Sequence, residues 1–187
     1  MLYRCEWSQK NEIYSNYHDE EWGKPLHDDQ KLFEFLILEG MQAGLSWITI
    51  LKKREAFRIA YENFDVDKVA GFDQQKVEEL MLNSGIIRNR LKIEASINNA
   101  RRFLEVVEEF GSFDSYMWSF VDYQPIVNCW AKLSEIPAKT ELSDRISDDL
   151  KRRGFKFVGS TIVYSHLQAT GVINDHLVSC FCHPDNR

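Results

Sequence analysis

Cysteine and histidine residues lie near both ends of this chain, and their types and spacing could form a metal-binding site. Cys5 and His18 lie near the N-terminus, whereas His176 and Cys180 are four residues apart near the C-terminus. Residues spaced i, i+4 share one face of a helix, so the second pair could reach a single ion. Two thiolates and two imidazoles form the tetrahedral ligand set that suits structural zinc. Such a site would also hold together chain ends that otherwise fray.

The same four residues have a second interpretation, as unconnected members of the core. Free cysteine is commonly buried as a small apolar side chain. The usual spacing of a zinc finger is absent from this sequence. Cys182 and His183 are nearby alternative ligands, but they break the i, i+4 relation to His176. On spacing alone, zinc is favoured by a small margin over a core role.

A single acid in an apolar segment is the second group that could do chemistry. Glu39 stands at the end of an apolar run and is followed by small residues at Gly40, Ala43 and Gly44, which leave room for a ligand. A carboxylate at the C-terminal end of a helix opposes the helix dipole, so it turns to solvent or has a specific partner. One acid among aromatic faces could bind a planar cationic ring. The aromatic candidates are Trp7, Tyr17, Trp22 and Trp47. The alternative interpretation of each is a side chain packed in the core.

A third motif combines a glycine with basic residues. Residues 80–90 are typical of a helix, a tight turn at Gly85 and the basic start of a second helix. We expect Gly85 to adopt a positive φ, and free backbone N–H groups before the second helix could bind a phosphate. Arg88, Arg90 and Lys92 favour DNA as the ligand. The alternative is an ordinary connector between two antiparallel helices.

The elements that must position these residues are predicted to be helices. Apolar spacing of three and four predicts a helix over residues 28–40, with Asp28 as its N-cap and Gly40 as its end. Gly154 and Gly171 are expected to stop two later helices. Further helices are expected to begin near Ser46, Asp73, Arg88, Ser112, Ser143 and Gly159. Alternating strand patterns are scarce, so the sequence predicts an all-α fold.

Composition limits the classes of protein to which the chain can belong. Its 187 residues are 44% hydrophobic and 28% charged, which is typical of one ordinary globular domain. The sequence has neither a bilayer-length apolar run nor a signal peptide, so we expect a cytoplasmic protein with no membrane partner. The four cysteines should therefore be reduced or metal-bound. Because the net charge is −6, DNA binding would depend on local basic clusters at 52–54, 88–92 and 151–156.

These motifs resemble, in one order from end to end, the 3-methyladenine DNA glycosylase I family of constitutive bacterial alkylation-repair enzymes. The matching segments are Arg4 to Trp7, Tyr17 to Gly23, Leu38 to Trp47, Gly85 to Arg88, Arg153 to Gly159 and Asn174 to His176. The resemblance implies the all-α fold of the helix-hairpin-helix glycosylases, as a single domain over residues 1–187. It places the helix-hairpin-helix element at about 73–100. It also implies that the terminal segments, about 1–25 and 172–187, pack together around zinc.

The resemblance assigns roles to the residues of the metal and pocket motifs. The ligands of one structural zinc ion would be Cys5, His18, His176 and Cys180. Four protein ligands leave no open position for a reactive water. Glu39 would accept hydrogen bonds from the amine and ring edge of an extruded base. The aromatic side chains around that base would be Tyr17 and Trp47, stacked on it, and Trp7 and Trp22, as pocket walls.

The implied reaction is hydrolysis of the N-glycosidic bond of 3-methyladenine in double-stranded alkylated DNA. Methylation at N3 makes the base cationic and weakens that bond. Much of what the enzyme must still do is to select the base and move it out of the DNA base stack. A monomer would release free 3-methyladenine and leave an abasic site. No lysine nucleophile is indicated, so no strand cleavage is expected. The DNA contacts would be Gly44 and Leu45 beside the abasic position, and Ser84, Gly85, Ile86 and Arg88 in the hairpin.

The sequence also departs from the family and superfamily patterns. Met41 and His166 differ from the residues expected at their positions, which puts action on 3-methylguanine in doubt. Residues 91–96 have no counterpart to the aspartate that most superfamily members place after the hairpin. Two other functions compete with the glycosylase: a zinc-stapled DNA-binding module and a zinc-dependent base deaminase. The deaminase is disfavoured because its H-x-E and P-C-x-x-C signatures are missing.

Overall fold

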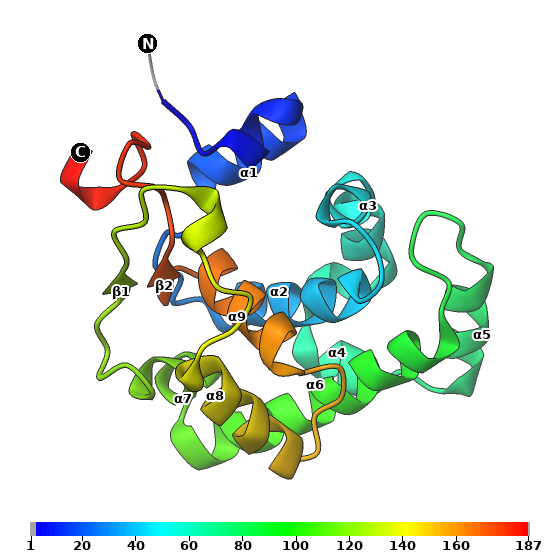
Figure 1. The fold of residues 1–187 in the computed structure, drawn as a ribbon. Helices are drawn as coiled ribbons and strands as arrows, with labels where there is room; N and C mark the ends of the chain where they lie inside the picture. Colours follow the sequence, from blue (N-terminus) through cyan, green and yellow to red (C-terminus); the bar gives the residue numbers. More distant parts are fainter. Residues whose placement is uncertain (1–2, 187) are drawn as a thin grey trace.

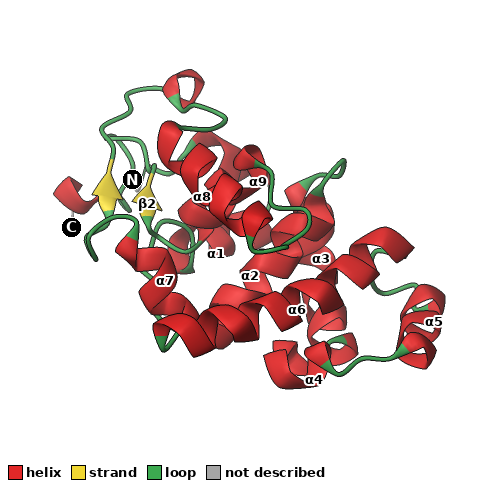
Figure 2. Cartoon of the chain, turned by 90° about the horizontal axis from the view of Figure 1, so that it is seen from below, coloured by secondary structure: helices red, strands yellow, loops and turns green. Residues whose placement is uncertain are grey.

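The structure is a computed structural model that describes residues 3–186, and helices dominate it (Figures 1 and 2). The α-helices are α1 (Glu12–Glu20), α2 (Asp29–Gln42), α3 (Trp47–Ala60), α4 (Val66–Ala70), α5 (Gln74–Leu82), α6 (Arg90–Phe110), α7 (Phe113–Ser119), α8 (Glu141–Arg152) and α9 (Ser160–Ala169). The 3-10 helices are η1 (Glu6–Lys10), η2 (Glu62–Phe64), η3 (Leu133–Glu135) and η4 (Pro184–Asn186). The prediction of a mainly helical fold is confirmed.

Two short strands are the exception to the all-α prediction. Strand β1 (Ile126–Val127) pairs in parallel with β2 (Ile173–Asn174). The pairing continues past the end of β1, where the backbone N–H of Asn128 donates to the carbonyl of Asn174 at 3.0 Å. Two-residue strands are too short to show an alternating pattern in a sequence. Their effect is to dock the segment after α7 onto the C-terminal segment.

Side-chain caps fix several helix starts where the sequence predicted them. The side chains of Asp28, Asp73 and Ser112 each accept a hydrogen bond, at 2.9 Å, from a backbone N–H in the first turn of the helix that follows. Gly154 and Gly171 follow α8 and α9 with φ values of +90° and +68°. Glycine adopts this left-handed conformation without the penalty that a Cβ imposes, so both residues end helices as expected.

Other helix boundaries differ from the prediction. Helix α8 begins behind Thr140, and Ser143 lies in its first turn, where the two residues cap each other's backbone. Helix α2 continues past Gly40 because glycine is tolerated where a helix is packed on all sides. Helix α6 begins at Arg90 behind the cap Asn89 rather than at about Arg88. Helices α1 and α4 were not predicted.

Helix α2 lies at the centre of the fold and is surrounded by other elements. It contacts α3, α6, α7 and α9, and these neighbours leave no solvent-exposed face at its C-terminal half (Figure 1). Its buried residues are Leu32, Phe33, Glu34, Phe35, Leu36, Ile37, Leu38, Glu39, Gly40 and Met41. A helix that is apolar nearly all round is expected to be central in this way. The last turn of α2 therefore presents Glu39 inside the molecule.

The two ends of the described chain lie on the same side of the molecule (Figures 1 and 2). The backbone N–H of Phe181 donates to the carbonyl of Tyr3 at 2.8 Å. This contact brings the segment before η1 against the segment after β2. Within residues 3–186, no helix is long and apolar enough to cross a bilayer.

Candidate active site and metal cluster

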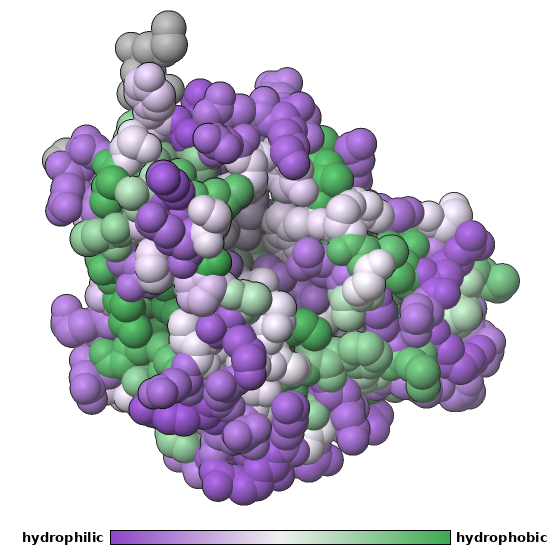
Figure 3. All heavy atoms as spheres, in the orientation of Figure 1, coloured by the Kyte–Doolittle hydropathy of each residue, from purple (hydrophilic) through white to green (hydrophobic). Residues whose placement is uncertain are grey.

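A cavity of about 260 Å³ opens between α1, α2, α3 and α9. The face drawn in Figure 3 is hollowed near its centre, where these helices meet in Figure 1. Its lining residues are Trp7, Tyr14, Tyr17, Trp22, Glu39, Gln42, Trp47, Leu133, Ile136, Ser165 and Gln168. All five residues of the predicted base pocket therefore meet in one place, although they come from η1, α1, α2, α3 and the turn after α1.

The aromatic side chains form walls of this cavity rather than a stack of their own. Trp7 meets Trp22 edge to face, with ring centroids 5.1 Å apart and an angle of 76°. Tyr17 and Trp47 are tilted by 57° at 5.6 Å. Tilted and edge-to-face pairs leave ring faces free for another planar group. The indole Nε1 of Trp47 is buried, and its interaction with the Tyr17 side chain falls short of a well-formed hydrogen bond, so a donor is also available to a ligand.

Glu39 is the acid of the cavity, and burial sets its charge state. The residue is 4% exposed, and burial raises the pKa of its carboxyl group to about 8. No group among the described residues donates a hydrogen bond to this carboxyl group or forms an ion pair with it. The pKa of neighbouring Tyr17 is also raised, first by burial and then by the charge of Glu39. A buried acid without a partner suits a cationic ligand.

Several lining residues were missed from the sequence, although some follow from helical spacing. Gln42 is three residues after Glu39, and Tyr14 is three residues before Tyr17, so each shares a helix face with a predicted site residue. Ser165 and Gln168 have the same spacing on α9 but no motif that marks them. Leu133 and Ile136 come from the segment around η3, and nothing in their local sequence indicates that they reach the cavity.

Partly buried ion pairs of one arginine join the helices around the cavity. The guanidinium of Arg54, on α3, donates to both carboxylate oxygens of Glu21 at 2.7 and 2.8 Å. Its Nε donates to Glu34 on α2 at 2.6 Å, and the group lies 4.9 Å from the centre of the Phe35 ring. Because Glu21 follows α1, one side chain connects α1, α2 and α3. The walls of the cavity are thereby fixed relative to one another.

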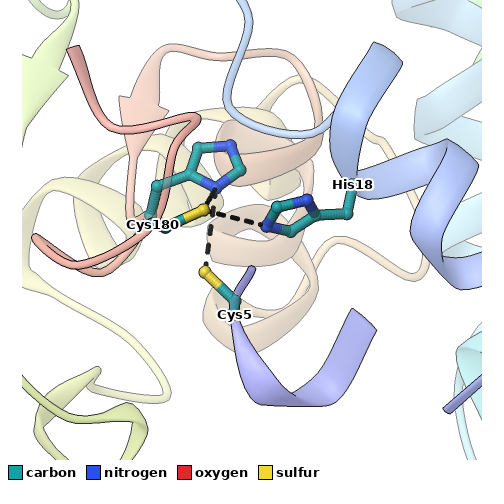
Figure 4. Close-up of side chains that lie close together, drawn as sticks. Cys5, His18 and Cys180 are labelled. Atoms are coloured by element: carbon teal, nitrogen blue, oxygen red, sulfur yellow. Dashed lines mark hydrogen bonds between the residues drawn. The ribbon is translucent and has the colours of Figure 1, made fainter. Parts of the chain in front are cut away.

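The predicted metal ligands form one buried cluster (Figure 4). The ligand atoms of Cys5, His18, His176 and Cys180 all lie within 4.8 Å of one another. Cys180 Sγ is 3.4 Å from His18 Nε2 and 3.6 Å from His176 Nδ1, which is 3.8 Å from Cys5 Sγ. Zinc bonds of about 2.0–2.3 Å place tetrahedral ligand atoms roughly 3.3–3.8 Å apart. The donor set and its spacing therefore fit a zinc ion.

Hydrogen bonds orient both imidazole rings toward this cluster. His18 Nδ1–H donates to Asp19 at 2.8 Å, and Arg4 binds the same carboxylate at 2.8 Å. His176 Nε2–H donates to the carbonyl of Trp22 at 2.9 Å. The nitrogen that faces the cluster is then the one with the free lone pair. Metal-binding histidines are typically held in this way by a carboxylate or a backbone carbonyl.

The reason given from the sequence for pairing His176 with Cys180 was wrong. The two residues lie in a turn after β2 and not on a helix, and the backbone N–H of Cys180 donates to the carbonyl of Leu177 at 2.8 Å. Cys182 lies close enough to His18 and Asp19 to form a smaller group with them. The alternative ligand His183 points elsewhere, because its Nε2–H donates to the carbonyl of Asn128 at 3.1 Å.

The loop after α2 carries the two residues expected to enter the duplex. Gly44 has φ of +79°, and no heavy atom would lie within 4 Å of a Cβ at this position. Leu45 is 42% exposed. The loop therefore projects from the surface beside Gln42 and Trp47, which line the cavity.

The segment between α5 and α6 is a tight turn, but Gly85 does not have the predicted positive φ. A Cβ at Gly85 would lie 3.0 Å from both the Ala56 Cβ and the Asn83 Oδ1, so close packing explains the glycine. Ile86 is 2% exposed and belongs to the core, so only its backbone is free to contact DNA. Ser84 and Arg88 are exposed.

Ion pairs distinguish the basic residues of the predicted DNA-binding clusters. Arg90 pairs with Glu78 at 2.8 Å, and Arg153 pairs with Glu109 at 2.6 Å. Arg88 has no acidic partner within residues 3–186. Cations that already bind carboxylates offer less charge to a phosphate. A phosphate beside this turn would therefore meet less competition from carboxylates at Arg88 than at Arg90.

The two departures from the family pattern lie in the core and not on the cavity wall. Met41 is 1% exposed and packs in the main core. His166 is 3% exposed, and its Nε2–H donates to the carbonyl of Leu32 at 3.1 Å. Burial lowers the pKa of His166 to about 4, so its ring is neutral at pH 7.

Similar proteins cover nearly the whole chain. A sequence model of the methyladenine glycosylase family matches residues 7–183. The DNA-3-methyladenine glycosylase 1 of Escherichia coli (strain K12) is 52% identical over 184 residues, 98% of each protein. The DNA-3-methyladenine glycosylase of Haemophilus influenzae is 48% identical over 182 residues, 97% of this chain and 98% of that protein. A 3-methyladenine DNA glycosylase I variant crystallised in complex with 3-methyladenine is 39% identical, with a TM-score of 0.94 and 97% of each chain covered.

Proposed function

The chain belongs to the methyladenine glycosylase family, and we propose that it removes 3-methyladenine from alkylated double-stranded DNA. It hydrolyses the N-glycosidic bond, releases the free base and leaves an abasic site for base-excision repair. The observation that carries this function is Glu39, a buried carboxyl group that lines an aromatic cavity and has no partner among the described residues.

Charge explains how this cavity selects its base. A 3-methyladenine in DNA carries a positive charge, which the ring faces of Tyr17 and Trp47 attract. The same charge lowers the pKa of Glu39 from its raised value and favours the carboxylate. The carboxylate then accepts hydrogen bonds from the exocyclic amine and the ring edge. Trp7 and Trp22 complete the walls, and an undamaged neutral adenine gains less from each of these contacts.

The chemistry needs little help from the protein because the leaving base departs neutral. Its departure leaves an electron-poor sugar, which water attacks. No lysine among residues 3–186 lines the cavity. The buried Lys92 after the hairpin instead donates to the carbonyls of Met41 and Ala43 at 2.8 and 2.5 Å. With no amine placed to form a Schiff base, the enzyme is monofunctional and leaves the strand uncut.

The remaining surface binds the duplex. The helix-hairpin-helix element, about 73–100, holds the DNA backbone through Ser84, Arg88 and the backbone of Gly85 and Ile86. Gly44 and Leu45 fill the gap that the extruded nucleotide leaves, consistent with the exposed leucine of this loop. Residues 1–187 act as one domain and as a monomer. The cytoplasmic location stays a prediction.

One structural zinc ion binds to Cys5, His18, His176 and Cys180. The buried S₂N₂ donor set and the hydrogen bonds that orient both histidines support this assignment. Bound zinc would supply a fixed link between the terminal segments, about 1–25 and 172–187. Four protein ligands leave it no role in activating water. The zinc-dependent deaminase is therefore the weaker alternative.

The test is base release from N-methylated duplex DNA by the zinc-loaded protein, resolved by chromatography. We expect free 3-methyladenine to appear while 7-methylguanine stays in the DNA, and the strand to break only after alkali treatment. If no base is released although the protein binds the duplex, the chain is a DNA-binding module. Strand breaks without alkali would contradict the monofunctional reaction.

A further inference from the structure

Lys92 is a buried lysine whose charge is used inside the protein. It lies in the first turn of α6, and its residue is 7% exposed. Its Nζ donates to the carbonyl of Met41 at 2.8 Å and to that of Ala43 at 2.5 Å. Neither acceptor is a carboxylate, and no ion pair within residues 3–186 includes Lys92. The ammonium group thus binds the main chain at the end of α2.

The C-terminal end of α2 is where a positive charge stabilises the helix most. The carbonyl groups of the last turn have no partners within the helix and carry its negative dipole end. Helix α2 has no basic residue of its own in that turn, so Lys92 supplies the charge from another helix. Met41 is inside α2 and Ala43 follows it. One ammonium group therefore spans the helix end and the start of the Gly44–Leu45 loop.

The surroundings of Lys92 oppose its charge. Leu36, Ile37 and Phe157 are among the side chains around it, and burial lowers the pKa of its ammonium group. An apolar residue would pack at this position with less loss of solvation. Residues that violate local packing rules are commonly those that serve function.

The backbone of Lys92 is hydrogen-bonded to the end of the hairpin turn. Its backbone N–H donates to Asn89 Oδ1 at 3.1 Å, and Asn89 is the last residue before α6. A continuous chain of contacts therefore runs from the hairpin through Lys92 to the last turn of α2. That turn carries Glu39, and the loop after it carries Gly44 and Leu45.

We propose that Lys92 is a positioning residue that fixes the Glu39 turn and the Gly44–Leu45 loop relative to the hairpin that binds DNA. This inference rests on the proposed glycosylase function. When the hairpin binds the DNA backbone, the contact of the Lys92 ammonium group with the end of α2 determines where Glu39 and the Gly44–Leu45 loop lie on the duplex. A misplacement of about 1 Å at a reacting centre can lower a rate by as much as a hundredfold.

Lys92→Met tests this role, because it keeps the length of the buried stem and removes the donor. We expect the single-turnover rate of 3-methyladenine release from duplex DNA to fall by about tenfold or more. The Kd for free 3-methyladenine and the Kd for unmodified duplex should each change by less than about threefold, since the cavity and the hairpin are both intact. Lys92→Arg, which retains the charge and donors, should recover part of the rate.

Arg101→Met is the matched control. Arg101 lies on the same helix, and its Nε donates to the carbonyl of Ala70, at the end of α4, at 3.0 Å. Arg101→Met also removes a hydrogen bond from a cationic side chain to a carbonyl at a helix end, but this bond lies away from the cavity. Excision should therefore proceed at the native rate. A native rate in Lys92→Met would overturn the inference. So would equal losses in rate, base affinity and melting temperature, which indicate a merely structural residue. If the native protein itself releases no base, the proposed function fails instead.

Discussion

The carboxyl group of Glu39 makes the free energy of unfolding of the ligand-free protein depend on pH. Its pKa is raised by burial from 4.5 to about 8, so the folded protein holds this proton more tightly than the unfolded chain. Between these two values the native state binds more protons than the unfolded state. The free energy of unfolding therefore decreases as pH rises from about 4.5 to about 8. The acid is a destabilising group that binding a cation would relieve.

Glu39→Gln should remove this contribution, because a neutral amide does not titrate. At pH 8 or above, the variant should have a free energy of unfolding on the order of 1–3 kcal/mol higher than the native protein. At pH 4.5 the two proteins should differ little. Urea unfolding of the ligand-free proteins at both pH values makes the comparison. Native and variant proteins with the same pH dependence of unfolding would show that burial does not raise the pKa of Glu39.

Residue types were enough to predict the centre of the cavity but not its whole wall. An acid in an apolar segment is expensive to bury, so Glu39 could be singled out with its aromatic neighbours. Ser165 and Gln168 are ordinary polar residues of a helix, and only the packing of α9 on α2 brings them to the cavity. Gly85 was predicted as a glycine of special importance, but close packing against Ala56 is a tertiary cause that local sequence does not contain.

The two arginines at the turn between α5 and α6 differ in whether a carboxylate neutralises their charge. Arg88 is exposed and has no acidic partner in the described part of the chain, whereas Arg90 is bound to Glu78 at 2.8 Å. The two residues are neighbours in sequence and have the same formal charge. A phosphate beside the turn would replace no ion pair at Arg88, but it would compete with a carboxylate at Arg90. The pair therefore offers a controlled comparison.

Arg88→Gln should weaken binding to duplex DNA, and Arg90→Gln should weaken it much less. Removing one phosphate contact should lower the slope of log K against log salt by about 0.9. Titrations of labelled duplex at several salt concentrations measure both the Kd and this slope. If both variants lose affinity and slope equally, the ion pair with Glu78 does not decide which arginine contacts DNA.

Element boundaries show where the sequence was informative. Asp28 was predicted as a cap, and Asp73 and Ser112 as helix starts. In the structure, all three side chains accept a hydrogen bond from a backbone N–H within one turn. The turn that holds His176 and Cys180 was mistaken for a helix because a four-residue spacing does not distinguish the two. Its conformation depends on β1 pairing with β2, a contact between residues that are distant in the chain.

The whole molecule is closed by contacts between its two ends. Cys5 and His18 come from the first elements, and His176 and Cys180 come from the last segment. This arrangement was predictable as a set of ligand types at both ends of the sequence. The packing around it was not, because the hydrogen bonds from His176 to Trp22 and from Phe181 to Tyr3 depend on the folded chain.

Loss of one ligand should therefore release the metal and loosen both ends together. Cys180→Ser should lower the bound zinc from about one equivalent toward zero and lower the melting temperature. Cys182→Ser should keep the ion, and Cys129→Ser is the matched control because Cys129 is exposed and outside the cluster. Elemental analysis and thermal unfolding of the three variants provide the test. Equal metal loss from Cys180→Ser and Cys182→Ser would overturn the assignment of the fourth ligand.

The central claim is that the Glu39 carboxylate recognises the cationic base in the aromatic cavity during excision. The most direct measurement is the single-turnover rate of 3-methyladenine release from duplex DNA by the native protein and by Glu39→Gln. We expect the variant to remain folded and to bind unmodified duplex normally, but to release the base about a hundredfold more slowly. Release at the native rate by Glu39→Gln would contradict the account.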